Sequence, residues 1–387
     1  MFRAVVFDMD GVITDTEKLY RRFQLEEGKK LGIPDDVMVV ACERIAGGTK
    51  YTNKKSFEDV VGMGIDYFDF REAVVNKLDA HIRAHGVELK PGVADTLKYL
   101  KEKGEYVIGL GRREKSVPEV DEYICCDMDS EAIDGIMASV KVDKIDAIIH
   151  LAADMRKEPY NVEVVAHNCV GTQRLLEFAE REHIGVFLQL SSLPVIGKPE
   201  EHPITEKHSL KPPTVYHATK IAEELLANYA DYMHGVRTAS FRISAPVGPG
   251  VNPKTIFPTF VTKAKNGEDL ILSGKGSRVQ TYVHVRDIAK ALYLALYSGK
   301  AHGIYNLSSY NAVSNKQLAE LCVKLLESDS RIIFSGKEDF MDDYIWDVSL
   351  EHIKEDIGYE PEILIEEAIL ELSLIHISEP TRRVVIS

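Results

Sequence analysis

The feature that most constrains the fold is a series of strand-length apolar runs, the later of which alternate with helical patterns. The runs are RAVVF, YVIGL, YICC, DAIIHLAA, VFLQLSS and TASFRIS, and the helical patterns include VGTQRLLEFAEREH and KIAEELLANYADYMH. Strands that are continuously apolar, with helices between them, indicate a parallel sheet covered on both faces. We therefore predict a doubly wound α/β fold with a mostly parallel sheet.

The first two apolar runs are separated by a segment of different character, from about residue 15 to 90. It contains helical patterns that end at Gly32 and Gly86, and it contains no convincing strand. A further helix is expected over residues 91–104, closing at Gly104. The sequence thus predicts a helical cap inserted after the first strand.

Charge and composition exclude several classes of protein. The formal net charge of -14 argues against a nucleic-acid partner, because a phosphate backbone requires a basic face. No apolar run approaches the roughly 20 residues of a membrane span, and the amino terminus lacks a signal-peptide pattern. The five cysteines form no C-x-x-C pair. We expect a globular cytoplasmic protein with a small-molecule substrate.

Two carboxylates, Asp8 and Asp10, end the first apolar run in FDMDGV. Alternate strand residues share a face, so both can reach one ligand such as Mg²⁺. This stretch resembles the haloacid dehalogenase superfamily, in particular its β-phosphoglucomutase-type phosphatases and phosphomutases. The resemblance covers residues 1–104 and implies a nucleophilic Asp8, an acid/base Asp10, a Mg²⁺ site at both and a sugar-phosphate substrate. The later Thr or Ser, Lys and acidic pair of that family are missing from their expected order.

A tyrosine and a lysine, Tyr216 and Lys220, stand one helical turn apart in VYHATK. An ammonium can lower the pKa of a nearby tyrosine, which then serves as a general acid or base. The same spacing occurs twice elsewhere in the chain, so the neighbouring motifs must decide whether this pair is catalytic.

The neighbouring motifs are HLAA, NCVGT, LQLSSLPVIG, FRISAPVGPG and RVQTYVHVRDIAKAL. In this order the motifs resemble the extended short-chain dehydrogenase/reductases, the NAD-dependent epimerase/dehydratase family, over about residues 105–371. The resemblance implies that Ser192 is the catalytic serine and Tyr216 the acid/base. It also implies that Lys220 binds a ribose and acts as the electrostatic partner of Tyr216.

The same resemblance assigns further residues to the cofactor. Asp127 would lie beside the adenine, Ala152 would contact the cofactor, and Asn168 would support the catalytic helix and a proton relay. Arg112 at the end of the second strand leaves the choice between NAD and NADP open. Arg278 either binds a nucleotide phosphate or is a solvated loop residue.

Two departures bear on the reaction. The dehydratases of this family usually carry an acidic pair after the catalytic residue, whereas Leu193 and Pro194 follow Ser192. Ala245 and Val247 also replace a usual Asn and Tyr. The resemblance therefore favours an epimerase or reductase acting on a nucleotide sugar over a dehydratase.

The T-G-x-x-G-x-x-G turn that binds the cofactor pyrophosphate is absent from the chain. Asp8 and Asp10 stand in its place, and at an effective dielectric of about 20 each like-charge pair roughly 5 Å apart costs about 3 kcal/mol. We expect weak dinucleotide binding or none, unless Mg²⁺ bridges the charges. We interpret the chain as a chimera joined near residues 104–111, with the first strand filling the centre of a Rossmann-like sheet.

The expected organisation has three parts. Residues 1–104 form the dehalogenase-like fragment, and residues 105–371 form the epimerase-like domain with a small C-terminal substrate-binding region. Residues 372–387 begin with LSLIHISEPTR, which resembles a translated sequencing-library adapter, and we expect them to be disordered and without function. Three interpretations remain: an epimerase, a Mg²⁺-dependent phosphatase, and an inactive chimera, which we favour. A homodimer is an open alternative to a monomer.

Overall fold

The computed structural model of the chain describes residues 4–8, 16–45, 50–62, 64–85, 104–111, 120–126, 128, 131–155 and 162–375. The chain divides into two compact units. The first unit comprises residues 1–187 and 214–236, and the second comprises residues 188–213 and 237–387. Within the described ranges, no helix combines the length and the apolar character needed to cross a membrane.

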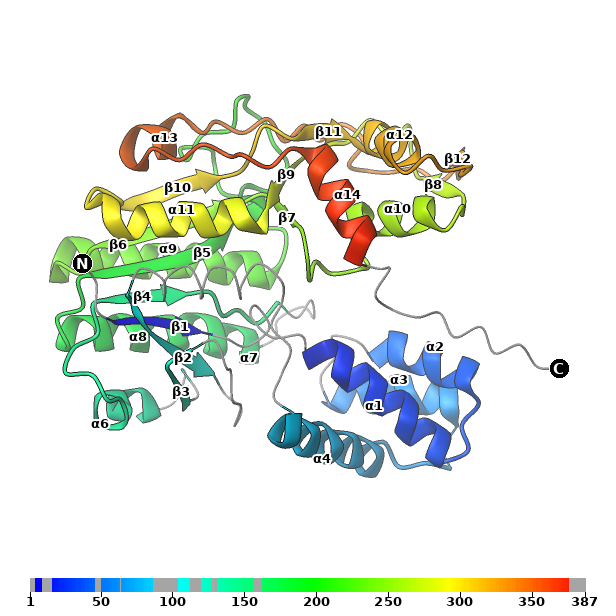
Figure 1. The fold of residues 1–387 in the computed structure, drawn as a ribbon, viewed down its shortest axis with the longest axis horizontal. Helices are drawn as coiled ribbons and strands as arrows, with labels where there is room; N and C mark the ends of the chain where they lie inside the picture. The colour runs from blue at the N-terminus through cyan, green and yellow to red at the C-terminus, as the bar shows by residue number, and fades with distance from the viewer. Residues whose placement is uncertain are drawn as a thin grey trace. The chain divides into compact units, whose positions relative to one another are not determined.

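The largest sheet has seven strands in the order β10-β6-β5-β4-β1-β2-β3 (Figure 1). They are β1 (Ala4–Asp8), β2 (Tyr106–Gly111), β3 (Glu122–Cys125), β4 (Ala147–His150), β5 (Val186–Ser192), β6 (Thr238–Ile243) and β10 (Gly303–Leu307). The six apolar runs form β1 to β6, so the predicted strands are confirmed. A central first strand with later strands extending to both sides defines the predicted doubly wound, Rossmann-like fold.

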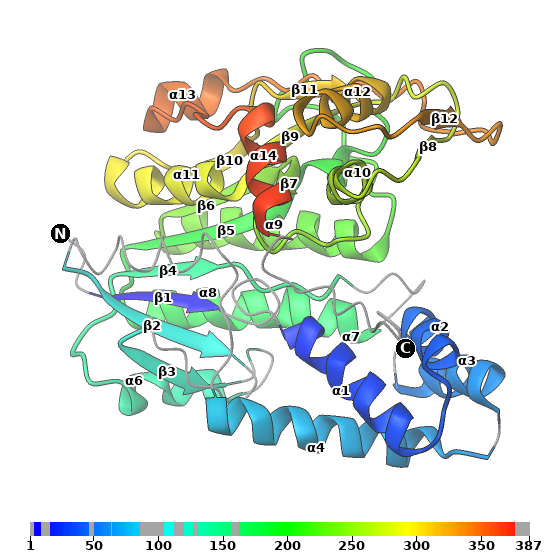
Figure 2. The same cartoon turned by 45° about the vertical axis from the view of Figure 1, so that its right-hand side comes forward.

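Strand β1 lies between β2 and β4 and is parallel to both (Figure 2). Val5 is aligned with Val107 of β2 and with Ala147 of β4, and both of these partners are fully buried. Strands covered on both faces favour such consecutive apolar residues. The prediction that the first strand fills the centre of the sheet is confirmed, and its last residue, Asp8, is aligned with Leu110.

The helical insertion predicted after the first strand is present. Its helices are α1 (Thr16–Lys30), α2 (Asp35–Ile45), α3 (Lys50–Val61) and α4 (Tyr67–His85). They share a core of their own that includes Met38, Phe57 and Phe70, and the rings of Phe57 and Phe70 stack with centroids 4.7 Å apart. Apart from Gly104, the helix predicted over residues 91–104 lies outside the described residues.

The core of the first unit includes Ile148, Phe178 and Phe187, and further described helices follow along the chain. They are α6 (Ile136–Ser139), α7 (Val162–Val165), the π-helix η2 (Ala166–Val170), α8 (Gly171–Arg181) and α9 (Val215–His234), with a 3₁₀ turn η1 (Glu131–Gly135). The Thr214 side chain caps α9 by accepting a hydrogen bond from the backbone N–H of His217.

The second unit adds two small sheets to its share of the large one. The first is ordered β11-β9-β7, and the second pairs β12 with β8. The strands are β7 (Ala245–Val247), β8 (Leu270–Leu272), β9 (Val279–His284), β11 (Ala312–Ser314) and β12 (Ile332–Phe334). The helices are η3 (Leu193–Ile196), α10 (Ile256–Lys265), α11 (Val285–Ser298), α12 (Asn315–Leu325), α13 (Glu351–Ile357) and α14 (Ile365–Ile375).

The last helix, α14, corrects one prediction. Leu372 is 3% exposed and belongs to the same apolar cluster as Ala368 and Ile369. Lys265 Nζ donates a hydrogen bond to the carbonyl of Ser373 at 2.6 Å. The prediction of disorder from residue 372 onward is therefore wrong for residues 372–375, because Leu372 continues the buried face of the helix. Residues 376–387 lie outside the described residues.

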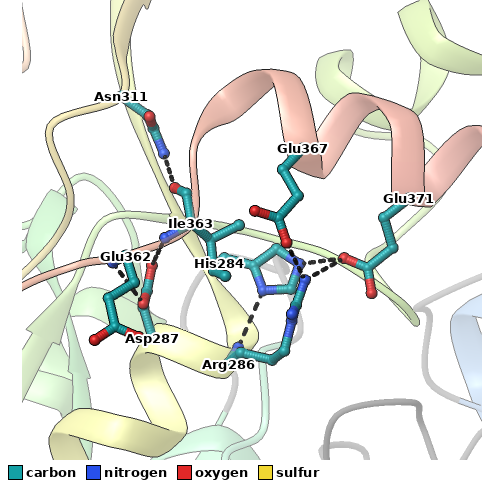
Figure 3. Close-up of polar contacts among 8 residues, drawn as sticks. All are labelled: His284, Arg286, Asp287, Asn311, Glu362, Ile363, Glu367 and Glu371. Carbon is teal, nitrogen blue, oxygen red and sulfur yellow. Dashed lines mark hydrogen bonds and ion pairs between the residues drawn. The ribbon is translucent and has the colours of Figure 1, made fainter.

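The segment that leads into α14 is held by a buried carboxylate (Figure 3). Asp287, in the first turn of α11, accepts hydrogen bonds from the backbone N–H groups of Glu362 and Ile363 at 3.0 and 3.2 Å. Asn311 Nδ2 donates to the carbonyl of Ile363 at 2.8 Å. Burial raises the pKa of Asp287, although these backbone donors oppose that shift.

The helix α14 itself is joined to α11 by ion pairs (Figure 3). Arg286 Nη2 lies 3.0 Å from Glu367 and 3.1 Å from Glu371, and His284 Nε2 lies 2.9 Å from Glu371. His284 Nδ1 accepts a hydrogen bond from the backbone N–H of Arg286, so the ring proton of neutral His284 is on Nε2. Burial lowers the pKa of His284, and Glu371 opposes this effect.

Candidate functional site

The centre of the candidate site is the first part of α9. Tyr216 is half-buried and Lys220 is 2% exposed, and Lys220 Nζ lies 6.0 Å from the centroid of the Tyr216 ring. Burial raises the pKa of Tyr216, Lys220 lowers it, and Glu223 raises it. The predicted pair is thus brought together, with a carboxylate of the same helix acting against the ammonium.

Asn168 holds this part of α9 in place. Its Nδ2 donates to Thr219 Oγ1 at 2.8 Å, and Thr219 Oγ1 in turn donates to the carbonyl of Tyr216 at 2.8 Å. Asn168 also joins both backbone groups of Asp154, with Oδ1 accepting at 2.7 Å and Nδ2 donating at 3.1 Å. Asn168 lies in the π-helix η2, a local distortion that is frequent at functional sites.

The motifs HLAA and NCVGT are joined by a hydrogen bond between their side chains. His150, the last residue of β4, places Nε2 2.9 Å from Thr172 Oγ1, and both side chains are buried. Burial, together with Lys220, lowers the pKa of His150 to about 3, so the ring is neutral near pH 7. Ala152 follows His150 by two residues and is also buried.

Ser192 belongs to the second unit. It is the last residue of β5, it is half-buried, and it directly precedes η3. Leu193 and Val195 of η3 are buried, and Gly197 ends the turn with a positive φ of 72°. The structure therefore places Ser192 at a strand end followed by an apolar turn.

Arg278 is a partly buried residue that directly precedes β9. Its Nε is buried, and the hydroxyl of Tyr282 is buried as well; neither atom has a hydrogen-bond partner among the described residues. Positions 278, 280 and 282 alternate along an extended chain and so share one face. Sequence analysis named Arg278 but missed Tyr282, although this alternation was visible in RVQTY.

Several predicted residues are described only in part or not at all. Asp8 is described as the last residue of β1. Asp10, Arg112 and Asp127 lie outside the described residues. Across the described ranges, no group of three or more His, Cys, Asp or Glu side chains forms a metal site. The proposed Mg²⁺ ligands Asp8 and Asp10 therefore stay a prediction.

A nicotinamide dinucleotide fits these residues only in part. The buried Lys220 and the Tyr216 beside it suit the nicotinamide half. The pyrophosphate half requires glycines and backbone N–H groups at the end of the first strand, where this chain has Asp8 followed by MDGV. A carboxylate at that sequence position would repel a pyrophosphate.

Comparison with known proteins agrees with this architecture. Residues 94–308, more than half of the chain, match the profile of the NAD dependent epimerase/dehydratase family, and the chain belongs to that family. Residues 2–111 match the profile of haloacid dehalogenase-like hydrolases. The two matches correspond to the two resemblances found in the sequence.

The chain is 30% identical to a dTDP-glucose 4,6-dehydratase from an Actinoplanes species over 63% of this chain and 75% of the relative. Among solved structures it resembles the UDP-glucose 4-epimerase of Thermotoga maritima, with a TM-score of 0.64 and 20% identity over 74% of this chain and 95% of the other. It also resembles the dTDP-glucose 4,6-dehydratase of Bacillus anthracis, solved with NAD, with a TM-score of 0.60 and 20% identity over 73% and 92%. These two structures agree with the chain in fold.

Proposed function

We propose that this chain is a protein of the nucleotide-sugar epimerase type. It would retain the residues that bind the sugar nucleotide, and it would bind NAD or NADP weakly or not at all. The observation that carries the proposal is the pair of Tyr216 and Lys220 on a helix fastened by Asn168. A neutral tyrosine beside an ammonium can exchange a proton with a sugar hydroxyl at its Oη. The family resemblance gives Ser192 the role of a hydrogen-bond donor to the substrate.

The residues after Ser192 support an epimerase or reductase over a dehydratase. Elimination of water from a sugar requires a base and an acid in addition to the tyrosine. Leu193 and Pro194 supply neither, and Leu193 is buried. By the family resemblance, dehydratases usually carry an acidic pair at these two positions.

Arg278 and Tyr282 support a nucleotide-phosphate site. A guanidinium pairs well with phosphate oxygens, and a buried donor without a partner favours a ligand that supplies one. The relatives named above include proteins solved with UDP-glucose and with NAD. We assign the nucleotide diphosphate of a sugar nucleotide to Arg278 Nε and to the Tyr282 hydroxyl.

Calorimetric titration of the folded chain with UDP-glucose and with dTDP-glucose tests this proposal. We expect micromolar binding of at least one of them and at least a tenfold loss in Arg278→Gln, which is about 1.4 kcal/mol. Arg331→Gln, at an exposed ion pair with Asp269, is the matched control and should bind as the wild type does. Absence of binding up to millimolar ligand would contradict the proposal.

A second candidate function rests on the match of residues 2–111 to haloacid dehalogenase-like hydrolases. In that function Asp8 would be the nucleophile of a Mg²⁺-dependent phosphatase. Phosphate release from sugar phosphates that requires Mg²⁺ and is abolished by Asp8→Asn would support it. Release that survives Asp8→Asn would come from a contaminant and would remove this candidate.

We also propose a homodimer formed through α9. The exposed residues on this helix include a stripe of large apolar side chains, namely Leu225, Tyr229, Tyr232 and Met233. Their spacing repeats every helical turn, which favours packing against another helix. Sedimentation velocity of the wild type and of Tyr232→Glu should show a dimer and a monomer, respectively; a monomeric wild type would contradict this proposal.

A further inference from the structure

Besides Tyr216, Lys220 has a charged neighbour on its own helix. Lys220 Nζ lies 2.8 Å from Glu223 Oε2, three residues further along α9. An ion pair at this spacing is common on helix surfaces, where both ends are solvated. Here Lys220 and Glu223 are only 2% and 1% exposed.

The second carboxylate oxygen of Glu223 makes the pair unusual. Oε1 is buried and has no hydrogen-bond partner among the described residues. A buried ion pair contributes little to stability unless its remaining hydrogen-bonding capacity is satisfied, and apolar residues of similar size often stabilise a fold as well or better. Stability alone therefore gives no good account of a glutamate at this position.

Among the described residues, groups that interact with this pair lie on α9, η2 and β4. On α9 they are Tyr216 and Glu224, in addition to Lys220 and Glu223 themselves. Cys169 of η2 interacts with both Lys220 and Glu223, and His150 of β4 interacts with Lys220. Next to Tyr216 lies His217, whose ring is 5.0 Å from the tyrosine ring.

We infer that Glu223 is a positioning residue that holds the Lys220 ammonium by a buried ion pair and offsets its field at the Tyr216 hydroxyl. This inference deepens the proposed function, because it rests on Tyr216 acting as the acid/base. Since Tyr216 stands one turn before Lys220 and Glu223 stands one turn after it, the carboxylate draws the ammonium along the helix away from the tyrosine.

The charge states of the surrounding groups agree with this role. Burial raises the pKa of Glu223 to about 7, with Lys220 opposing the shift. Burial lowers the pKa of His217 to about 4, and burial together with Lys220 lowers that of His150 to about 3. The pKa of Glu223 is therefore raised into the neutral range, whereas those of His217 and His150 are lowered away from it.

Nuclear magnetic resonance of ligand-free protein with ¹³Cζ-labelled tyrosine tests the inference. Tyr216→Phe assigns the resonance of Tyr216, and the resonance is followed against pH in the wild type, in Glu223→Gln and in Glu224→Gln. Glu224→Gln is the matched control, since Glu224 is equally buried on the same helix, whereas the ion pair of Lys220 that the structure gives is with Glu223.

We expect the Tyr216 resonance of the wild type and of Glu224→Gln to show an inflection near neutral pH. In Glu223→Gln this inflection should be lost and the titration of Tyr216 itself should shift to lower pH. A helix-stabilising role alone would move neither observable. An inflection that survives Glu223→Gln would overturn the inference. The absence of an inflection from the wild type would overturn it as well, and that measurement requires no variant.

Cys169 provides a second reporter. Burial, reinforced by Glu223, raises the pKa of Cys169 to about 11. Alkylation of this thiol, followed by peptide mass spectrometry, should therefore be faster in Glu223→Gln than in the wild type at the same alkaline pH. An unchanged rate would contradict the inferred position of the carboxylate. Both measurements use ligand-free protein, so their failure is distinct from a failure to bind nucleotide sugars.

Discussion

Asn168 Nδ2 donates a hydrogen bond to Thr219 Oγ1 at 2.8 Å, and this bond joins the π-helix η2 to the turn that carries Tyr216. Both side chains are buried. Asn168→Ala should lower the free energy of unfolding by about 2 to 3 kcal/mol, because it removes the buried hydrogen bonds of Asn168 to Thr219 Oγ1 and to the backbone of Asp154. Urea unfolding measures this loss. Gln173→Ala, on the exposed face of α8, should change stability by less than about 0.5 kcal/mol, and an equal effect of the two variants would contradict the assignment.

The buried Glu223 predicts a specific dependence of stability on pH. Its pKa in the folded state is raised from 4.5 to about 7, so the folded state retains the proton more strongly than the unfolded state. The contribution of protonated Glu223 to the free energy of unfolding is complete below about pH 4.5 and is lost as the pH rises through about 7. Relative to Glu223→Gln, the wild type should lose up to about 3 kcal/mol across this window. Urea unfolding at both ends of the window measures the difference, and a constant difference would disprove the buried titration.

The end of α14 predicts where the chain can be shortened. Removal of residues 376–387 should leave the melting temperature unchanged. Removal of residues 372–387 should destabilise the protein by about 2 to 4 kcal/mol, because it uncovers the cluster around Leu372 and removes the acceptor of Lys265. Thermal unfolding of the two truncations compares them directly. Equal melting temperatures would mean that Leu372 contributes no packing.

The contact between Asp287 and the segment before α14 predicts a large loss on substitution. Asp287→Ala leaves the backbone N–H groups of Glu362 and Ile363 without their acceptor, and it should cost about 3 kcal/mol. Asp269→Ala removes an exposed ion pair with Arg331 and should cost less than about 1 kcal/mol. Denaturant unfolding of both variants should rank them in this order, and the reverse order would refute the role of Asp287.

The strands were predictable because burial on both faces leaves consecutive apolar residues in the sequence. Val107 and Ala147, the residues of β2 and β4 that are aligned with Val5, show this burial. The pair of Tyr216 and Lys220 was predictable from spacing and context, since α9 keeps residues four apart on one face. These features depend on local pattern, which a single sequence displays.

Other features depend on contacts that a single sequence does not display. Lys220 and Glu223 have the spacing of an exposed helix pair, and only the fold shows that both are buried. Leu372 was assigned to a disordered tail because its neighbours resemble an adapter, whereas its burial depends on residues of α10 and α12. The hydroxyl of Tyr282 became a candidate ligand-binding group because it is buried and has no hydrogen-bond partner among the described residues. Such burial depends on how the side chains pack.

The central claim is that the chain kept the epimerase fold and the Tyr216 constellation but lost the dinucleotide site at the end of β1. Calorimetric titration of the chain ending at Ile375 with NADH and with NADPH, each with and without Mg²⁺, tests it most directly. Protein shown to be folded by circular dichroism should give no binding heat up to millimolar cofactor. Micromolar binding would contradict the claim, because Asp8 would then be compatible with the pyrophosphate that it is expected to repel.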